Sequence, residues 1–319
     1  MDTLKLLVSL PLLAAACVPD NDQNESLIET GRVIAVQMEP AEVAPRQTFK
    51  LRALAAGGEV DLDWSFCGEQ KPLSELGPIS RRCLAPRGAG LLDPFGSGVE
   101  VSATMPADAC RLFGPDRPPP KQGEPAGRPV DADPSGGYYQ PVSLFDYNEQ
   151  TSSLFEARVA CALPGVTRAQ YAEWTMRYVR NVNPSIDAIE AVHDGEAFVL
   201  DDGEPLQVGG VRSLELRVWA PLCGEELDPT AACGGAEPYL YFDIGSRELV
   251  TRTETLSASW FATAGSFQDS RTGLELTDEG ALAENRWVVP REAGEVTLWV
   301  VLRDNRGGVS WKSARLAVE

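Results

Sequence analysis

The sequence is poor in the residues that many enzymes and nucleic-acid-binding proteins use. Its 319 residues include one histidine, and 28 Lys and Arg stand against 47 Asp and Glu, which gives a net charge of −19. Affinity for nucleic acid comes largely from clustered positive charge, which a chain this acidic lacks. No nucleic-acid partner is therefore expected, and a basic patch that would hold the chain on anionic lipid is excluded for the same reason.

The short motifs of common enzyme classes are also missing. The sequence holds no CxxC pair, no GxSxG, no HExxH, no P-loop and no GxGxxG after a strand. Zinc sites built from Cys and His therefore have no support. A Ser-His-Asp triad would have to use His193, in AVHDGEAF, and its place beside Asp194 and Gly195 is typical of a turn. We predict no catalytic residue.

Long apolar runs are absent, and the one apolar segment at the start is short. It extends from Leu6 to Leu13 and is followed by three alanines and then Cys17. This length is too short to span a bilayer and is typical of a cleavable export signal. The stretch Ala14 to Cys17 resembles the lipobox of bacterial lipoproteins, although Ala14 replaces the more common leucine. The resemblance implies a signal peptide over 1–16 and lipid on Cys17.

The alternative is an ordinary secretory signal whose neighbouring cysteine is incidental. Under the lipoprotein interpretation, residues 17–31 are a polar tether, because VPDNDQNESLIETG is acidic and has no apolar period. Val18 follows the cysteine where inner-membrane lipoproteins of enteric bacteria carry aspartate. The resemblance therefore favours the outer membrane, on either its periplasmic or its surface face.

Six cysteines remain when Cys17 is set aside, and an even number in an exported chain suggests disulfides. Proximity favours Cys223 with Cys233 across a Gly/Pro-rich loop. We then prefer Cys67 with Cys83 and Cys110 with Cys161. The competing arrangement joins Cys67 to Cys161 beside a tryptophan, and the sequence does not decide between the two.

Alternation with period two marks the first part of the chain as strands. RVIAVQMEP from residue 32, TFKLRALAA from residue 48 and VDLDWSFC from residue 60 are short runs separated by Pro and Gly, a pattern typical of a β-sandwich. Residues 114–137 carry seven prolines and five glycines and lack the apolar side chains of a core. We interpret them as an insertion within a first domain, 32–182, because further strands follow; an inter-domain linker is the alternative.

One helix is predicted, over about 168–179. Thr167 is a good N-cap, and Gln170 three residues later completes a capping box. Tyr171, Trp174 and Tyr178 then share one helical face. This face is interpreted as a packing surface over one end of the sandwich, at the junction between two domains, in preference to an aromatic platform for a ligand.

The second part of the chain, 183–319, repeats the order of the first. SIDAIEAV corresponds to the first strand of the first domain, SLELRVWAP to the second and LSASWFATAG to the third, with Trp260 in the place of Trp64. Two related domains in tandem are therefore expected. The turn DNRGG between two apolar runs is a strong hairpin signal.

The last strands resemble bacterial immunoglobulin-like domains of the polycystic-kidney-disease or cadherin-like type. The family's W..P...G.....V.V.D..G pattern is approximated by Trp287, Pro290, Gly294, Val301, Asp304 and Gly307. The whole chain is similar to uncharacterised lipoproteins with two such domains. The fold class expected is all-β, with two tandem immunoglobulin-like β-sandwiches. The resemblance supplies no activity, because this fold carries many functions.

Acidic residues offer the remaining candidates for chemistry. Calcium needs several converging oxygens, and no EF-hand or repeated DxDxDG pattern is present. No cofactor is predicted, and calcium is the one metal ion for which the acidic residues supply candidate ligands. Its candidate ligands are Asp61, Asp63, Asp201, Asp202 and Asp304.

Two classes of function are compatible with these features. The favoured one is a non-catalytic, lipid-anchored protein of the cell envelope that binds or scaffolds an envelope protein or polysaccharide through its sandwiches. The alternative is an envelope hydrolase, glycosidase-like, that uses loop carboxylates. A concave acidic cleft holding two carboxylates with perturbed pKa values would favour the hydrolase.

Overall fold

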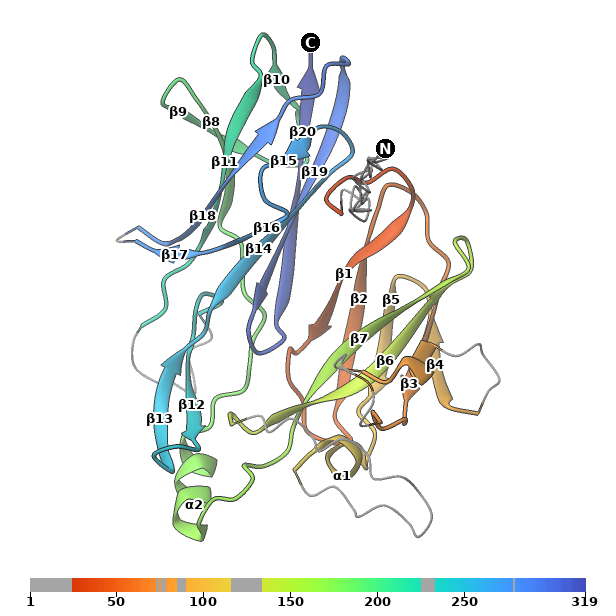
Figure 1. Ribbon diagram of the computed structural model, residues 1–319, viewed down its shortest axis with the longest axis vertical. Coiled ribbons are helices and arrows are strands. Elements are labelled where there is room, and N and C mark those ends of the chain that lie inside the picture. Colours follow the sequence, from red (N-terminus) through yellow and green to blue (C-terminus); the bar gives the residue numbers. More distant parts are fainter. Residues whose placement is uncertain are drawn as a thin grey trace, which may run out of the picture.

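Strands with alternating burial build most of the chain in the computed structural model (Figure 1). In β2 (Thr48–Ala56), Phe49, Leu51 and Ala53 are buried, and the residues between them face solvent. This is the pattern of a sheet with one face on a core. The structure describes residues 25–72, 75, 79–84, 90–115, 134–224, 233–277 and 279–319.

The first sandwich packs a three-stranded sheet, in the order β1-β2-β5, on a four-stranded sheet, in the order β4-β3-β6-β7. All neighbouring strands in both sheets are antiparallel. Trp64 of β3 is fully buried between the sheets, and its indole N–H donates to the carbonyl of Gly98 at 2.8 Å. The bounds are β1 (Arg32–Glu39), β3 (Leu62–Cys67), β4 (Leu92–Ser97), β5 (Glu100–Thr104), β6 (Gly137–Asp146) and β7 (Thr151–Ala160).

The second sandwich is larger and has its own core. One sheet has the order β15-β18-β11-β8-β9, with β17 beside β18, and the other has the order β10-β20-β19-β14-β16. The bounds in the first sheet are β8 (Ala188–His193), β9 (Glu196–Leu200), β11 (Ser213–Ala220), β15 (Ser266–Phe267), β17 (Glu275–Leu276) and β18 (Ala281–Val288). Those in the second are β10 (Leu206–Val208), β14 (Leu256–Ala262), β16 (Arg271–Gly273), β19 (Gly294–Asp304) and β20 (Val309–Val318).

The two sandwiches share one strand order, so the prediction of two immunoglobulin-like sandwiches is confirmed. The order β1-β2-β5 corresponds to β8-β11-β18, and β4-β3-β6-β7 corresponds to β16-β14-β19-β20. In each sandwich a segment before the second strand pairs in parallel with the last strand, at Val43 and Val159 in the first and between β10 and β20 in the second. Trp64 and Trp260 occupy corresponding strands, and both are fully buried.

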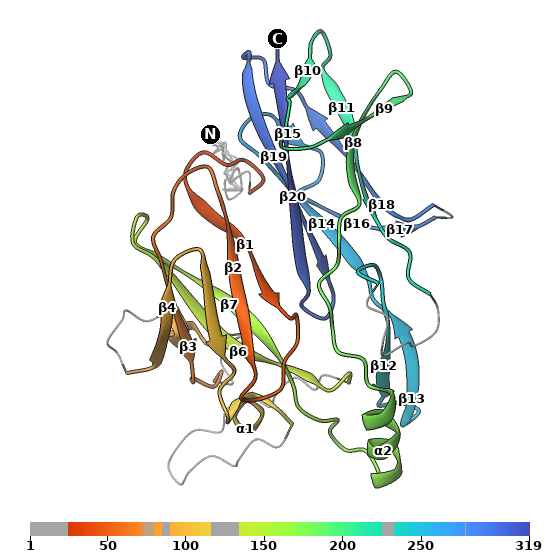
Figure 2. The same cartoon turned by 180° about the vertical axis from the view of Figure 1, so that it is seen from behind.

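A two-stranded hairpin, which sequence analysis missed, interrupts the second sandwich. β12 (Pro238–Asp243) and β13 (Glu248–Thr253) are inserted between β11 and β14. The predicted helix is α2 (Arg168–Arg177), and its capping box is present. Its Trp174 packs on Leu240 and Phe242 of the hairpin. The Trp174 indole N–H also donates to the carbonyl of Ser135, just before β6 of the first sandwich, at 3.2 Å. The helix therefore lies at the junction of the domains, as predicted, and both views show the hairpin beside α2, a contact that was not predicted (Figures 1 and 2).

Two shorter helices were also missed, α1 (Ala109–Phe113) and the 3₁₀ turn η1 (Arg81–Leu84). Within the part of the chain that the structure describes, no helix has the length and apolar character needed to cross a bilayer. The expected insertion at 114–137 falls mostly on residues 116–133, and the expected signal peptide and Cys17 precede residue 25. All of these lie outside the described residues.

The six cysteines among the described residues form three disulfide bonds. Cys67 bonds Cys83 and Cys110 of α1 bonds Cys161 after β7, so the competing bond between Cys67 and Cys161 is not formed. The third disulfide joins Cys223 to Cys233. These are the pairs that sequence analysis preferred. The Cys110–Cys161 bond spans 51 residues and the Cys223–Cys233 bond spans 10.

These spans predict different losses of stability. A disulfide that closes a longer loop restricts the unfolded chain more. Replacing both Cys110 and Cys161 by serine is expected to lower the free energy of unfolding by about 4 kcal/mol, against about 3 kcal/mol for the matched pair Cys223 and Cys233. Urea unfolding of the two double variants measures the difference. A greater loss from the shorter loop would contradict the prediction.

Candidate functional site

The two sandwiches meet along an apolar face of the second domain. The outer face of β1 and β2 lies on β14, β19 and β20, and the apolar residues at this contact form two clusters. Their members are Ile28, Ile34, Ala35, Leu54, Ala56, Phe261, Trp299, Val301, Val309 and Trp311. Because these side chains point away from both sandwich cores, their burial depends on the contact between the domains.

The segment before β1 takes part in the same contact. The N–H of Ile28 donates to the carbonyl of Ala262 in β14 at 2.9 Å, and the N–H of Ala262 donates to the carbonyl of Ser26 at 2.9 Å. Ser26 and Ile28 are buried. The last residues of the expected tether, 25–31, therefore belong to the folded structure and contact the second domain.

A charged cluster fills one end of this contact, with Glu42 at its centre. Glu42 follows β1 and is completely buried. Its Oε2 accepts from Nε of Arg158 at 3.1 Å and from the N–H of Asn181 at 3.0 Å. Its Oε1 accepts from the hydroxyl of Tyr178. One carboxylate thus joins a strand of the first sandwich to the segment that connects the domains.

Arg158 of β7 is held by groups of the first domain. Its Nη1 donates to the hydroxyl of Tyr139 at 2.8 Å and its Nη2 to Oγ of Ser135 at 2.6 Å. Tyr139 faces Arg158 on β6, and the guanidinium extends over Gly137 two residues earlier, where a Cβ would lie 2.1 Å from Arg158 Nη2. A glycine is therefore needed at this position to admit the guanidinium.

Arg306, in the turn between β19 and β20, connects the cluster to the second domain. Its Nη1 donates to Oε1 of Glu254 at 3.1 Å, and its Nη2 donates to the carbonyl of Val179 at 3.0 Å. Nη2 also lies 3.5 Å from Oε2 of Glu42. The hydroxyl of Tyr139 donates to the carbonyl of Arg306 at 3.3 Å. Arg306 therefore contacts both sandwiches and the connecting segment.

The turn that presents Arg306 is shaped by Asp304. Oδ1 of Asp304 accepts from the N–H of Arg306 at 2.7 Å and from the N–H of Gly308 at 2.8 Å. Oδ2 accepts from Nδ2 of Asn181 at 3.1 Å. Asp304 was a candidate calcium ligand, and in the structure its carboxylate caps a hairpin turn and bonds the connecting segment.

Acidic groups outnumber arginines in this cluster, and the pKa values reflect it. Burial, followed by repulsion from Asp304, raises the pKa of Glu254 to about 8, although Arg306 opposes the shift. Burial also disfavours ionisation of Glu42, but Arg158 and Arg306 outweigh it and hold the pKa of Glu42 below its usual value. Burial and the neighbouring Glu42 raise the pKa of Tyr178. Glu254 therefore keeps a proton at neutral pH.

The cluster is enclosed, which decides what it can do. The side chains of Glu42, Glu254 and Arg306 are at most 3% exposed. A substrate cannot reach them without separation of the domains, so the perturbed carboxyl of Glu254 does not form the open acidic cleft of a hydrolase. The arrangement can fix the two sandwiches in one relative orientation.

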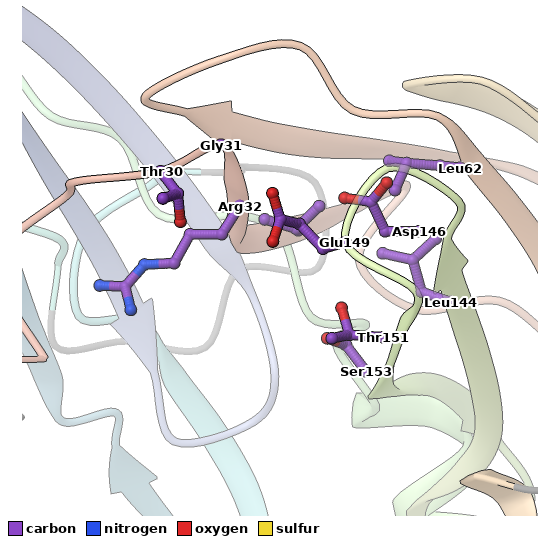
Figure 3. Close-up of a pocket in the computed structure, with 10 residues that line it drawn as sticks. Thr30, Gly31, Arg32, Leu62, Leu144, Asp146, Glu149, Thr151 and Ser153 are labelled. Carbon is purple, nitrogen blue, oxygen red and sulfur yellow. The ribbon is translucent and has the colours of Figure 1, made fainter.

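A polar pocket of about 290 Å³ lies at the end of the first sandwich (Figure 3). Asp146 and Glu149 line it, but Oδ1 of Asp146 already accepts from the N–H groups of Asp61 and Asn148. The guanidinium of Arg32 is directed away from both carboxylates, and its Nη2 donates to the carbonyls of Glu25 and Leu27. The fold itself therefore uses Asp146 and Arg32.

The other sequence candidates are not brought together. Asp61 and Asp63 lie at the start of β3, whereas Asp201 and Asp202 are exposed in the loop after β9. Among the described residues, no group of three or more His, Cys, Asp or Glu side chains is placed to hold a metal ion. His193 is exposed at the end of β8, and its Nε2 lies 3.4 Å from Oδ2 of Asp194.

The charged cluster was not predicted from the sequence, although two of its members carried a signal. Glu42 stands between Ala41 and Val43, and Arg158 stands in the apolar strand segment ARVACAL. A charged residue within an apolar run is seldom buried without a partner. This signal marks single residues and does not indicate which of them pair.

Glu254 predicts how stability depends on pH. Its pKa is 4.5 in the unfolded chain and about 8 in the folded protein. Between these values the folded chain holds a proton that the unfolded chain releases, so the free energy of unfolding falls as pH rises through this window. Glu254→Gln is expected to flatten this slope, so that the variant loses less stability than the parent as the pH rises from about 5 to about 8.

Urea unfolding at several pH values between about 5 and 9 measures this slope. Glu248→Gln is the matched control, because Glu248 is exposed on the neighbouring strand and its loss also removes one carboxyl. The control should keep the parent's slope. Equal slopes for Glu254→Gln and the parent would contradict the assignment.

Arg306 predicts a large loss of stability. Arg306→Met removes one of the two cations beside the ionised Glu42 and the hydrogen-bond donor to the buried carboxyl of Glu254, and breaking a buried pair typically costs about 3–5 kcal/mol. Arg217→Met is the control, since Arg217 pairs with Glu215 and Glu284 at the surface. Surface pairs contribute about 0–1 kcal/mol each. Equal losses for the two variants, measured by urea unfolding, would argue against the cluster's role.

Comparisons with known proteins place the chain in no family. No protein-family model matches, and no curated protein gives a significant match. Trypsin-activated alpha-2-macroglobulin from Escherichia coli is 12% identical over 93% of this chain and 18% of its own length, with a TM-score of 0.22. The fibronectin(III)-like modules of Clostridium thermocellum CbhA are 7% identical over 89% and 94% of the two chains, with a TM-score of 0.22.

Murine CEACAM1b is 15% identical over 89% of this chain and 100% of its own, with a TM-score of 0.20. Likenesses at these TM-scores carry no argument about function. The chain also spans only a small part of the macroglobulin. The assignment of two immunoglobulin-like sandwiches therefore rests on the strand order, the parallel edge pairing and the buried tryptophans described above.

Proposed function

We propose that the protein is a non-catalytic, lipid-anchored component of the cell envelope, in which two sandwiches form one rigid unit that binds or scaffolds a partner. The observation that carries the proposal is the enclosed cluster of Glu42, Arg158, Arg306 and Glu254, which bonds both sandwiches and their connecting segment. Separation of the domains would break the contact between Arg306 and Glu42 and the hydrogen bond from Tyr139 to the Arg306 carbonyl, so the cluster favours a fixed arrangement over independent domains.

Fixed geometry suits a scaffold because its surfaces keep constant spacing and direction. The apolar contact through Leu54, Phe261 and Trp299 also holds the two domains in one relative orientation. A large apolar contact between domains opposes the relative motion that loosely joined domains show. Envelope proteins and polysaccharides are the partner classes available to a chain in that compartment.

The compartment is argued from the disulfides. Bonds such as Cys110–Cys161 persist in oxidising environments, which supports a compartment outside the cytoplasm. The anchor is argued from the sequence alone, because Cys17 lies outside the described residues. Lipid on Cys17 together with Val18 favours the outer membrane, and neither calcium nor another cofactor is part of the proposal.

The anchor is tested by labelling cells with a fatty-acid probe and fractionating the envelope. Cys17→Ser is expected to abolish labelling and to release a folded protein into the soluble envelope fraction. Pro19→Ser is the matched control, since it changes a nearby residue and keeps the cysteine. It should keep both the label and the membrane fraction.

Two outcomes would contradict the anchor. The first is an unlabelled parent protein in the soluble fraction, and the second is membrane retention of Cys17→Ser at the parent's level. Near-ultraviolet circular dichroism of the released variant shows whether its tryptophans keep their packed environment. A released but unfolded protein would leave the change of fraction unrelated to lipid, and the proposal would fail.

A further inference from the structure

The edge strand β9 presents an open hydrogen-bonding edge. It is the last strand of the sheet β15-β18-β11-β8-β9, and among the described residues its backbone pairs with β8 alone. Both views show the β8–β9 hairpin standing out from the second sandwich (Figures 1 and 2). Open edges of this kind are templates for an added strand.

The turn of the hairpin fixes which groups face outward. Asp194 and Gly195 both have positive φ, 52° and 83°, as in a two-residue type I′ turn. His193 and Glu196 then form the hydrogen-bonded pair that closes the turn, and bonded and non-bonded pairs alternate from there. The N–H and C=O groups of Ala197 and Val199 therefore point away from β8.

The side chains on this edge are apolar and exposed. Val199 is 70% exposed and Phe198 is 36% exposed, whereas Leu200 at the end of the strand is buried in the core. Proteins commonly protect an edge with lysine, proline or a bulge. The strand Glu196–Leu200 contains neither lysine nor proline, and its register with β8 is regular.

Acidic side chains surround the edge and determine what it can accept. No lysine or arginine occurs between Arg180 and Arg212. The exposed acidic residues beside the strand are Asp194, Glu196, Asp201, Asp202 and Glu204. A second copy would bring the same charges together, which opposes self-pairing. A segment with basic residues next to apolar ones complements the edge.

We propose that the outer edge of β9 binds an extended basic segment of a partner protein by strand addition. The outward groups of Ala197 and Val199 supply main-chain hydrogen bonds, Phe198 and Val199 supply apolar contact, and the acidic residues select basic side chains. The inference deepens the binding role proposed above and rests on it. It is independent of the anchor, so loss of peptide binding and loss of lipid are separate results.

The probe is a fluorescein-labelled eight-residue peptide of alternating lysine and valine, and the measurement is fluorescence anisotropy with the purified mature protein. Val199→Pro removes one outward N–H. It removes none of the N–H groups that bond β9 to β8. It is expected to weaken binding about tenfold, as loss of one hydrogen bond with its apolar contact implies. Val199→Thr keeps the N–H and is the matched control, expected to bind within about twofold of the parent.

A second arm changes the peptide and leaves the protein intact. The same peptide with N-methyl groups on alternate amides keeps its charge but loses its donors, and it should bind at least about tenfold more weakly. The version with glutamate for lysine should not bind. This arm decides the question even if Val199→Pro fails to fold.

Several outcomes would overturn the inference. They are absence of binding up to about 1 mM peptide, equal affinity for the acidic or the N-methylated peptide, and unchanged affinity in a folded Val199→Pro. Light scattering tests whether a second copy of the chain occupies the edge instead. A dimer that Val199→Pro abolishes would show that a second copy covers this edge.

Discussion

Buried charge at the contact between the domains is the constraint on which the arrangement depends. Glu42 is removed from water, and its ionised form persists only because Arg158, Arg306, Tyr178 and the Asn181 N–H surround it. An unpaired charge at this depth would cost several kcal/mol. These partners come from different elements, so each must be in place for the others to be stable. The apolar contact beside them contributes area, whereas the charged cluster specifies one orientation.

Local pattern accounts for what could be predicted from the sequence. Period two located β1 and β2, the repeated order with Trp64 and Trp260 revealed the tandem sandwiches, and Thr167 with its capping box located α2. The alternation and the capping box are each contained within a few neighbouring residues, and the repeat only compares such local patterns in order along the chain. Disulfide pairing by proximity agreed with the structure because each preferred pair joins cysteines adjacent in the sequence order.

Partners distant in the sequence account for what could not be predicted. Glu42 and Arg306 are 264 positions apart, and no local pattern connects them. The hairpin β12–β13 was not predicted, so the sequence did not show what Trp174 packs against. β19 did carry a signal, because its run from Val296 to Leu302 is apolar without alternation. Such a run is typical of a strand covered on both faces.

The segment 25–31 has a mechanical consequence. Ser26 and Ile28 bond Ala262 in the second sandwich, and the same chain continues directly into β1 of the first. A force applied to the chain ahead of residue 25 therefore reaches both sandwiches together rather than passing through one to the other. A force on the N-terminal segment is divided between the two sandwiches at residues 26–28. The segment that connects the domains is therefore not the first element to be stretched.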